Sequence, residues 1–204
     1  MTMVYLNGAM MPMEEAKISP MDRGFLFGDG VYEVIPSYDR RFIGFSLHIA
    51  RLKRNLLNIG IDLPISADSW LTTCQQLIQQ NSEQGANIGV YLQVSRGTDN
   101  RRFHAFPHNI PPTVFAFTFE TPPQPIADKR CVTPYKVVTA TDQRWSKCDI
   151  KSTSLLGNVL HFQQGANAGA NETILFNAQE ELTEASAANV FIVKQNVVIT
   201  PPLD

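Results

Sequence analysis

The sequence predicts a two-domain protein of the α+β class, in which a proline-rich segment separates two sets of strands and helices. Apolar runs bounded by turn residues indicate strands, and stretches with apolar residues at helical spacing indicate amphipathic helices. Thr121-Pro-Pro-Gln-Pro125 interrupts both patterns and is typical of an extended linker, because proline fixes φ and removes a backbone donor. We expect an N-terminal domain over 1–120, a linker over 121–127 and a C-terminal domain over 128–204.

The first domain is expected to contain two helices among short strands. The first helix begins at Ser46, a good N-cap, and ends near Gly60. Its apolar side carries Leu47, Ile49, Leu52, Leu56 and Leu57. The second helix covers 67–80 and carries Trp70, Leu71, Cys74, Leu77 and Ile78 on one side. Strands are predicted over 4–6, 31–38, 41–45, 88–95 and 113–119. The polar loop 96–112 is long for a compact domain, which favours a functional role.

The second domain is expected to be incomplete. We predict a strand over 136–139, a helix from about 152 to 168, a strand over 172–177 and a hairpin of 190–193 and 197–200. The chain then stops at Thr200-Pro-Pro-Leu-Asp204, directly after a strand and with no closing helix. A domain of roughly 80 residues is small for an independent core.

Composition disfavours several classes of protein. The chain has 17 basic and 19 acidic residues, and this net charge of −2 gives no electrostatic footprint for nucleic acid. No apolar run approaches the roughly 20 residues needed to cross a bilayer, and the N-terminus lacks the pattern of a signal peptide. Cys74, Cys131 and Cys148 are scattered and suggest reduced thiols, so we expect a cytoplasmic protein without disulfides.

Two ionisable residues are candidates for cofactor chemistry. Lys151 precedes a predicted helix whose core face carries Leu155, Leu156, Val159 and Leu160. A lysine buried at such a place would hold the neutral amine that Schiff-base formation needs. Glu184 could keep the nitrogen of a pyridine ring protonated. By local pattern alone, however, a surface lysine and a solvated glutamate are the commoner interpretations.

Four further residues could bind an anion. Arg102 and His104 flank Phe103 in the long loop, and alternate side chains of an extended segment point the same way. An arginine fork binds a carboxylate bidentately, and a histidine can add a hydrogen bond. Tyr32 could present its hydroxyl to a pocket, and Arg51 could reach an anion from the first helix. An exposed basic loop, a satisfied buried tyrosine and a snorkelling arginine remain the alternatives.

Other chemistries are weakly supported. Gly28-Asp-Gly30 lacks the full GxGxxG pattern, and a strand follows it where a dinucleotide-binding loop would open a helix. The four histidines lack metal-ligand spacing with cysteines or carboxylates, so no metal site is expected. No GxSxG elbow is present.

An ordered set of segments resembles the fold-type IV (class IV) pyridoxal-phosphate-dependent aminotransferases. One such motif would be weak evidence, but the set runs over the whole chain in the family's order. Arg96-Gly-Thr, Arg102-Phe-His104 and Arg144-Trp-Ser-Lys-Cys-Asp-Ile-Lys bring the resemblance closest to the D-amino-acid (D-alanine) transaminases. The matching segments are Met21-Asp-Arg-Gly-Phe-Leu-Phe-Gly-Asp-Gly-Val-Tyr-Glu-Val, His48-Ile-Ala-Arg-Leu, Asp149-Ile-Lys151-Ser, Leu155-Leu-Gly-Asn-Val-Leu, and Thr183-Glu184 through Asn189-Val-Phe-Ile-Val.

The resemblance implies a fold, a cofactor and a set of site residues. It implies an N-terminal α/β sandwich, a C-terminal α/β barrel-like domain, and transamination between a D-amino acid (D-alanine, D-glutamate) and a 2-oxo acid. Lys151 would bond pyridoxal 5'-phosphate and transfer the substrate proton as the catalytic residue. Three other residues match cofactor-binding positions of the family. Arg51 would bind the phosphate, Glu184 would contact the ring nitrogen, and Arg144 would lie near the cofactor. Tyr32, Arg102 and His104 match the trap for the substrate carboxylate, in which the loop pair comes from the neighbouring subunit of a homodimer.

Two departures from the family pattern matter. Ala185-Ser186-Ala187-Ala188 stands where the family usually has Gly-Ser-Ser-Ser, so hydroxyls near the cofactor are lost. The family also continues beyond the equivalent of Asp204 into two loops that bind the cofactor phosphate. Branched-chain aminotransferase, aminodeoxychorismate lyase and a non-catalytic truncated remnant are therefore the alternatives, and Arg102-Phe-His104 argues against the first two.

Overall fold

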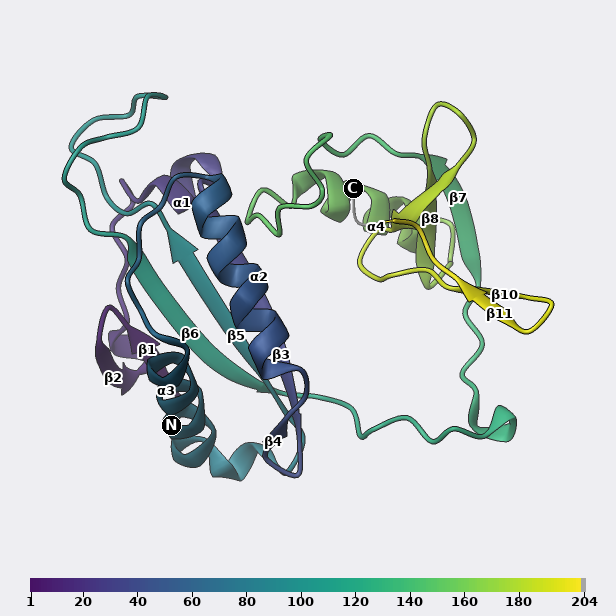
Figure 1. The fold of residues 1–204 in the computed structure, drawn as a ribbon, viewed down its shortest axis with the longest axis horizontal. Helices are drawn as coiled ribbons and strands as arrows, with labels where there is room; N and C mark the ends of the chain where they lie inside the picture. The colour runs from purple at the N-terminus through teal and green to yellow at the C-terminus, as the bar shows by residue number, and fades with distance from the viewer. Residues whose placement is uncertain (203–204) are drawn as a thin grey trace. The chain divides into compact units, whose positions relative to one another are not determined.

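The computed structural model describes residues 1–202, which form two compact units (Figure 1). Unit 1 comprises Met1–Pro125 together with the short segment Ile150–Ser154. Unit 2 comprises Ile126–Asp149 and the described residues from Leu155 onward. The domain limits expected from the sequence stay a prediction. Among the described residues, no helix combines the length and the apolar character that crossing a membrane requires.

Unit 1 is built on a six-stranded sheet in the order β2-β1-β6-β5-β3-β4, and all its neighbouring strands pair antiparallel. Its strands are β1 (Met3–Leu6), β2 (Ala9–Pro12), β3 (Gly30–Tyr38), β4 (Arg41–Phe42), β5 (Ile88–Ser95) and β6 (Thr113–Glu120). Its helices are α1 (Arg23–Phe27), α2 (Phe45–Asn58) and α3 (Ala67–Gln80). The short 3-10 turns Met13–Glu15 and Ser82–Gln84 complete it.

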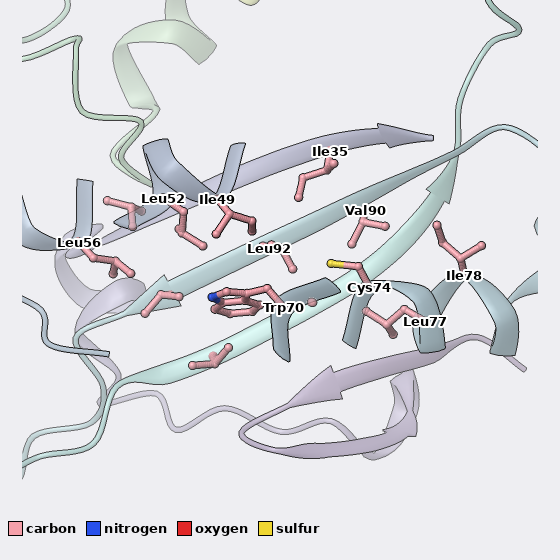
Figure 2. Close-up of a cluster of buried hydrophobic side chains, with 14 of the residues drawn as sticks. Ile35, Ile49, Leu52, Leu56, Trp70, Cys74, Leu77, Ile78, Val90 and Leu92 are labelled. Carbon is pink, nitrogen blue, oxygen red and sulfur yellow. The ribbon is translucent and has the colours of Figure 1, made fainter. Parts of the chain in front are cut away.

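The hydrophobic core of unit 1 lies between one face of this sheet and the helices α2 and α3. Figure 2 shows Ile49 and Leu52 of α2 and Trp70 of α3 directed toward Val90 and Leu92 of β5. All five side chains are buried. Burying apolar surface of this kind stabilises a fold by roughly 25 cal/mol per Å², so this cluster is the main source of stability in unit 1.

The two faces of β3 have different surroundings. Successive side chains of a strand point to opposite faces, so Val31, Glu33 and Ile35 are buried on the helix-covered face. Tyr32 lies on the opposite face, where its ring stacks on Tyr91 of β5 with centroids 5.5 Å apart. Adjacent residues of β3 therefore face different environments, either the core under the helices or the opposite face of the sheet.

Unit 2 contains a three-stranded sheet in the order β7-β8-β9 and a separate hairpin. The strands β7 (Val137–Thr141) and β8 (Glu172–Phe176) pair parallel, and α4 (Leu156–Asn167) lies between them in the chain and contacts both. β9 (Leu182–Ala185) pairs antiparallel with β8, while β10 (Ile192–Lys194) and β11 (Val197–Ile199) form the hairpin. A 3-10 turn covers Lys129–Cys131.

The mixture of helices and strands expected from the sequence is confirmed, but the region around the first helix differs. The helix 67–80 and the strand 88–95 have the predicted bounds. The strand predicted over 41–45 ends at Phe42, because Gly44 takes a left-handed φ of 63° and starts α2. Ser46 is therefore inside the helix and not its N-cap. Leu47 and Leu57 are exposed, so the predicted apolar side was too wide.

The prediction of a helix over 152–168 was wrong at its start. α4 begins at Leu156, because the preceding residues pair with β3 and belong to unit 1. Its expected core face was also wrong: Leu156, Val159 and Leu160 are exposed, whereas His161 and Gly165 are buried. The strands β2 and β9 were not predicted.

Candidate active site

The segment Ile150–Ser154 is fixed to the start of β3 by backbone hydrogen bonds. The amide of Tyr32 donates to the carbonyl of Lys151 at 3.0 Å, and the amide of Thr153 donates to the carbonyl of Gly30 at 3.0 Å. Because neighbouring residues of paired segments lie side by side, this pairing brings Lys151 next to Tyr32, although 119 positions separate them in the sequence.

The amino group of Lys151 lies at the Tyr32 side chain. Its Nζ donates a hydrogen bond to Tyr32 Oη at 3.3 Å and lies 4.3 Å from the centre of the Tyr32 ring. Lys151 is half-buried. Burial raises the pKa of the neighbouring Tyr91 phenol to about 12, so this hydroxyl stays neutral at physiological pH. The structure thus joins the lysine and the tyrosine that the sequence analysis selected for two different roles.

Arg144 and Glu184 meet in unit 2. Arg144 Nη1 donates a hydrogen bond to Glu184 Oε2. Asp142 holds the other edge of the same guanidinium: Arg144 Nε donates to Asp142 Oδ1 at 3.0 Å, and Nη2 donates to Asp142 Oδ2 at 2.9 Å. The hydroxyl of Thr183 donates to Asp142 Oδ2 at 2.8 Å. The orientation of Arg144, and through it that of Glu184, is therefore fixed.

This cluster has an excess of negative charge. Burial raises the pKa of Asp142, but the bonds from Arg144 and Thr183 outweigh burial and lower that pKa to about 2. Burial lowers the pKa of Arg144, but its bonds to Asp142 and Glu184 raise that pKa above the usual value. One guanidinium thus faces two carboxylates. Glu184 remains partly exposed, so a cationic group could reach it.

Arg51 is held by a carboxylate buried in the sheet. Its Nε and Nη2 donate to the two oxygens of Glu33 at 2.6 and 2.7 Å, and His48 Nδ1 lies 2.8 Å from Glu33 Oε2. Burial raises the pKa of Glu33, but the bonds from Arg51 and His48 outweigh burial and lower that pKa below its ordinary value. Arg51 is partly exposed. Among residues 1–202, its Nη1 donates no hydrogen bond. That nitrogen can donate to an anion.

Arg102 and His104 lie on the same side of their loop. The guanidinium carbon of Arg102 lies 5.0 Å from the centre of the Phe27 ring, and the His104 ring lies 5.4 Å from it. Both side chains are exposed. The expectation that alternate residues of this loop point the same way agrees with this geometry, and the pair offers a guanidinium and an imidazole to one ligand.

Three carboxylates that orient arginines were not predicted from the sequence. Asp142, Glu33 and Asp29 each accept hydrogen bonds from an arginine. Asp142 stands two positions before Arg144, so it could have been found from the sequence. Glu33 bonds an arginine 18 positions away, and Asp29 bonds arginines 6 and 67 positions away, which no local pattern indicates.

Comparison with known proteins assigns the family. The family model for class IV aminotransferases matches residues 30–204. The chain is 38% identical to a D-alanine aminotransferase of Bacillus licheniformis over 98% of this chain and 68% of that protein. It is 35% identical to a D-alanine aminotransferase of Listeria monocytogenes, over 98% of this chain and 68% of that protein. The chain belongs to the class IV aminotransferases. The resemblance noted from the sequence is confirmed.

Solved structures of this aminotransferase family have the same fold. A branched-chain aminotransferase from Escherichia coli matches with a TM-score of 0.83 and 20% identity, over 98% of this chain and 66% of that one. The enzyme of Thermoproteus uzoniensis, solved with norvaline, matches with a TM-score of 0.85 and 21% identity, over 99% of this chain and 68% of that one. This aminotransferase chain therefore has the fold-type IV architecture and spans about two thirds of the length of its relatives.

Proposed function

We propose that this class IV aminotransferase transfers the amino group of a D-amino acid, such as D-alanine or D-glutamate, to a 2-oxo acid with pyridoxal 5'-phosphate as cofactor. The observation that carries the proposal is the amino group of Lys151, half-buried and hydrogen-bonded to Tyr32 Oη at 3.3 Å. The D-alanine aminotransferases of Bacillus licheniformis and Listeria monocytogenes support the substrate class.

The residues of the chain fit this cofactor by charge and by donor set. The excess negative charge of the Asp142–Arg144–Glu184 cluster suits a protonated ring nitrogen at Glu184, and the free nitrogen of Arg51 suits a phosphate. Similar proteins are described with such groups: a Mycobacterium tuberculosis aminotransferase in a PLP-bound form, and a branched-chain amino acid aminotransferase with pyridoxamine 5'-phosphate. When bound, the cofactor supplies an electron sink for the substrate's Cα–H bond.

Each proposed site residue then has a defined task. Lys151 would hold the cofactor, and its amine would move the proton at the substrate Cα as the catalytic base and acid. Arg144 positions Glu184 by the hydrogen bond between them. Tyr32, Arg102 and His104 hold the α-carboxylate, for which a phenol, a guanidinium and an imidazole are suitable donors.

We also propose a cytoplasmic homodimer with domains over 1–120 and 128–204. The exposed side chains of Arg102 and His104 support an arrangement in which the loop serves a second copy. The three free cysteines support a reducing compartment. Branched-chain transamination is the weaker candidate, since the branched-chain structures cited above are only 20% and 21% identical.

The proposal is tested by adding pyridoxal phosphate to the purified chain and recording its visible absorption. A band that requires Lys151 and changes when D-alanine is added is the expected result. Lys151→Ala should abolish the band, whereas Lys147→Ala, a matched change at an exposed lysine four residues earlier, should keep it. Turnover of L-leucine and not of D-alanine would reject the D-specific proposal. Absence of any band would favour a non-catalytic protein.

A further inference from the structure

A buried cluster of two arginines and one aspartate contacts the loop that carries Arg102 and His104. Asp29 Oδ2 accepts hydrogen bonds from Arg23 Nε and Arg96 Nε, both at 2.8 Å, and Asp29 Oδ1 accepts from Arg96 Nη2 at 2.9 Å. The side chains of Arg23 and Arg96 are only 4% and 7% exposed. Burial raises the pKa of Asp29, but the bonds from both arginines outweigh burial and lower it. Asp29 is therefore an anion at neutral pH.

The remaining donors of Arg23 reach the loop directly. Arg23 Nη1 donates to the carbonyl of Phe103 at 2.6 Å, and Nη2 donates to the carbonyl of His104 at 3.2 Å. Phe103 is the residue between Arg102 and His104. One guanidinium thus binds the backbone at the centre of the proposed carboxylate-binding pair.

Arg96 connects the same loop to the rest of unit 1. Its Nη2 and Nη1 donate to the carbonyls of Ile59 and Gly60 at 2.7 and 3.2 Å, just after α2. Its guanidinium carbon lies 3.6 Å from the centre of the Phe106 ring. A cation stacked on an aromatic face in this way adds attraction, so the loop is held at a second point near its centre.

The loop needs such support because its central residues have little burial of their own. Residues 101–106 are all exposed, and the strands β5 and β6 hold only the two ends of the loop. The short helix α1 begins at Arg23 and ends at Phe27, whose ring contacts both Arg102 and His104. Arg23, which anchors the loop, and Phe27, whose ring contacts it, are therefore the two ends of the same short helix.

We propose that Arg23, Asp29 and Arg96 are positioning residues that hold Arg102 and His104 in place for a substrate α-carboxylate. This role rests on the proposed function. It identifies which residues outside the site control the affinity for the substrate carboxylate. The three residues act through the loop and do not touch the substrate. A loop held in its binding conformation loses less conformational entropy when the ligand binds, and so binds it more tightly.

The test compares Arg23→Gln with Arg101→Gln in the full chain supplied with pyridoxal phosphate. Both variants remove one guanidinium, but that of Arg101 lies on the exposed loop over the Phe103 ring and outside the cluster. Backbone order parameters of 101–106, obtained from nitrogen-15 relaxation, report anchoring without any turnover. Steady-state kinetics with D-alanine and a 2-oxo acid report carboxylate binding.

For Arg23→Gln we expect the backbone order parameters of 101–106 to fall from about 0.85 to below about 0.6. We expect KM for D-alanine to rise about tenfold with kcat changed by less than about threefold, since charge-assisted hydrogen bonds are lost. Arg101→Gln should leave the order parameters and KM near wild type. Arg23→Lys, which keeps the charge on a single donor nitrogen, should recover part of the lost affinity.

Asp29→Asn is a second variant that keeps the size of the side chain. It removes the charge and replaces one of the two oxygens that accept from the arginines with an NH2 donor. We expect it to raise KM in the same direction as Arg23→Gln. Unchanged order parameters in Arg23→Gln would overturn the anchoring. Lower order parameters with unchanged KM in Arg23→Gln and Asp29→Asn would overturn the positioning role while leaving the proposed transamination intact. A wild-type chain without transamination would reject the proposed function and the positioning role with it, and the order parameters would still decide the anchoring.

Discussion

At the scale of single residues, each of the proposed cofactor arginines is oriented by a carboxylate. Asp142 accepts from the amide, Nε and Nη2 of Arg144, and Glu33 accepts from Nε and Nη2 of Arg51. In both cases Nη1 remains to meet another group, which is Glu184 for Arg144. Because a guanidinium is planar, fixing one edge also fixes the direction in which the other edge donates.

The ion pair of Asp142 gives a prediction about pH. Its folded-state pKa of about 2 is below the unfolded value of about 3.9, so the pair stabilises the fold above pH 4 and loses that stabilisation as pH falls toward 2. The shift corresponds to about 2 kcal/mol. We expect Asp142→Asn to lower the free energy of unfolding at pH 6 by about this amount and to lower it by about half as much at pH 3. Urea unfolding monitored by circular dichroism at both pH values measures the difference.

Asp128→Asn is the matched control for this prediction. Asp128 also accepts from an arginine two positions later, Arg130, but that guanidinium is 89% exposed, against 6% for Arg144. An exposed pair contributes little, because solvent screens it. Asp128→Asn should therefore leave the unfolding free energy unchanged at both pH values. Equal losses in the two variants would contradict a special role for the buried pair.

At the scale of elements, Gly97 controls the path from β5 into the functional loop. Its φ is +102°, and a Cβ at this position would overlap the carbonyl oxygen of Pro111. Gly8 has a similar φ of +98°, but a Cβ there would contact nothing within 4 Å. We expect Gly8→Ala to cost about 1–2 kcal/mol from backbone strain alone, and Gly97→Ala to cost about 3–4 kcal/mol from strain and overlap together. Urea midpoints of the two variants measure both costs, and equal values would mean that the overlap relaxes freely.

An element could be predicted from the sequence where the spacing of its own apolar residues determines its bounds. α3 and β5 have the predicted bounds, because helical and strand spacing of their apolar residues coincides with burial. The start of α4 was missed because Ser152 pairs with Val31 of β3, a tertiary contact that overrides local propensity. The pairing of Lys151 with Tyr32 depends on the same contact, so the local sequence could nominate each residue but could not join them.

At the scale of the whole molecule, the two units bury very different amounts of apolar surface. The core cluster and the residues packed against it all belong to unit 1, from Tyr5 to Ala116 together with Ile150. Among the described residues of unit 2, the buried apolar side chains are Leu175 and Ala185. Stability scales with the apolar surface that folding buries. Unit 2 is therefore expected to unfold at a lower denaturant concentration than unit 1.

The two tryptophans allow the units to be followed separately. Trp70 lies in the core of unit 1 and is 2% exposed, and Trp145 belongs to unit 2 and is 48% exposed. Trp145→Phe leaves a reporter of unit 1, and Trp70→Phe leaves a reporter of unit 2. We expect the fluorescence of the two variants to give different urea midpoints, with the lower midpoint for the variant that retains Trp145. Coincident midpoints would instead mean that the chain unfolds as one cooperative unit.

Pyridoxal phosphate should raise the midpoint of the unit that binds it. Lys151 belongs to unit 1, so a cofactor held by this proposed residue stabilises the folded state of unit 1. At a cofactor concentration of about 100 Kd, the stabilisation is about 2.7 kcal/mol, and we expect it as a higher urea midpoint at Trp70. Lys151→Ala should weaken the effect, while Lys147→Ala should keep it. An unchanged midpoint at Trp70 would mean that Lys151 does not hold the cofactor.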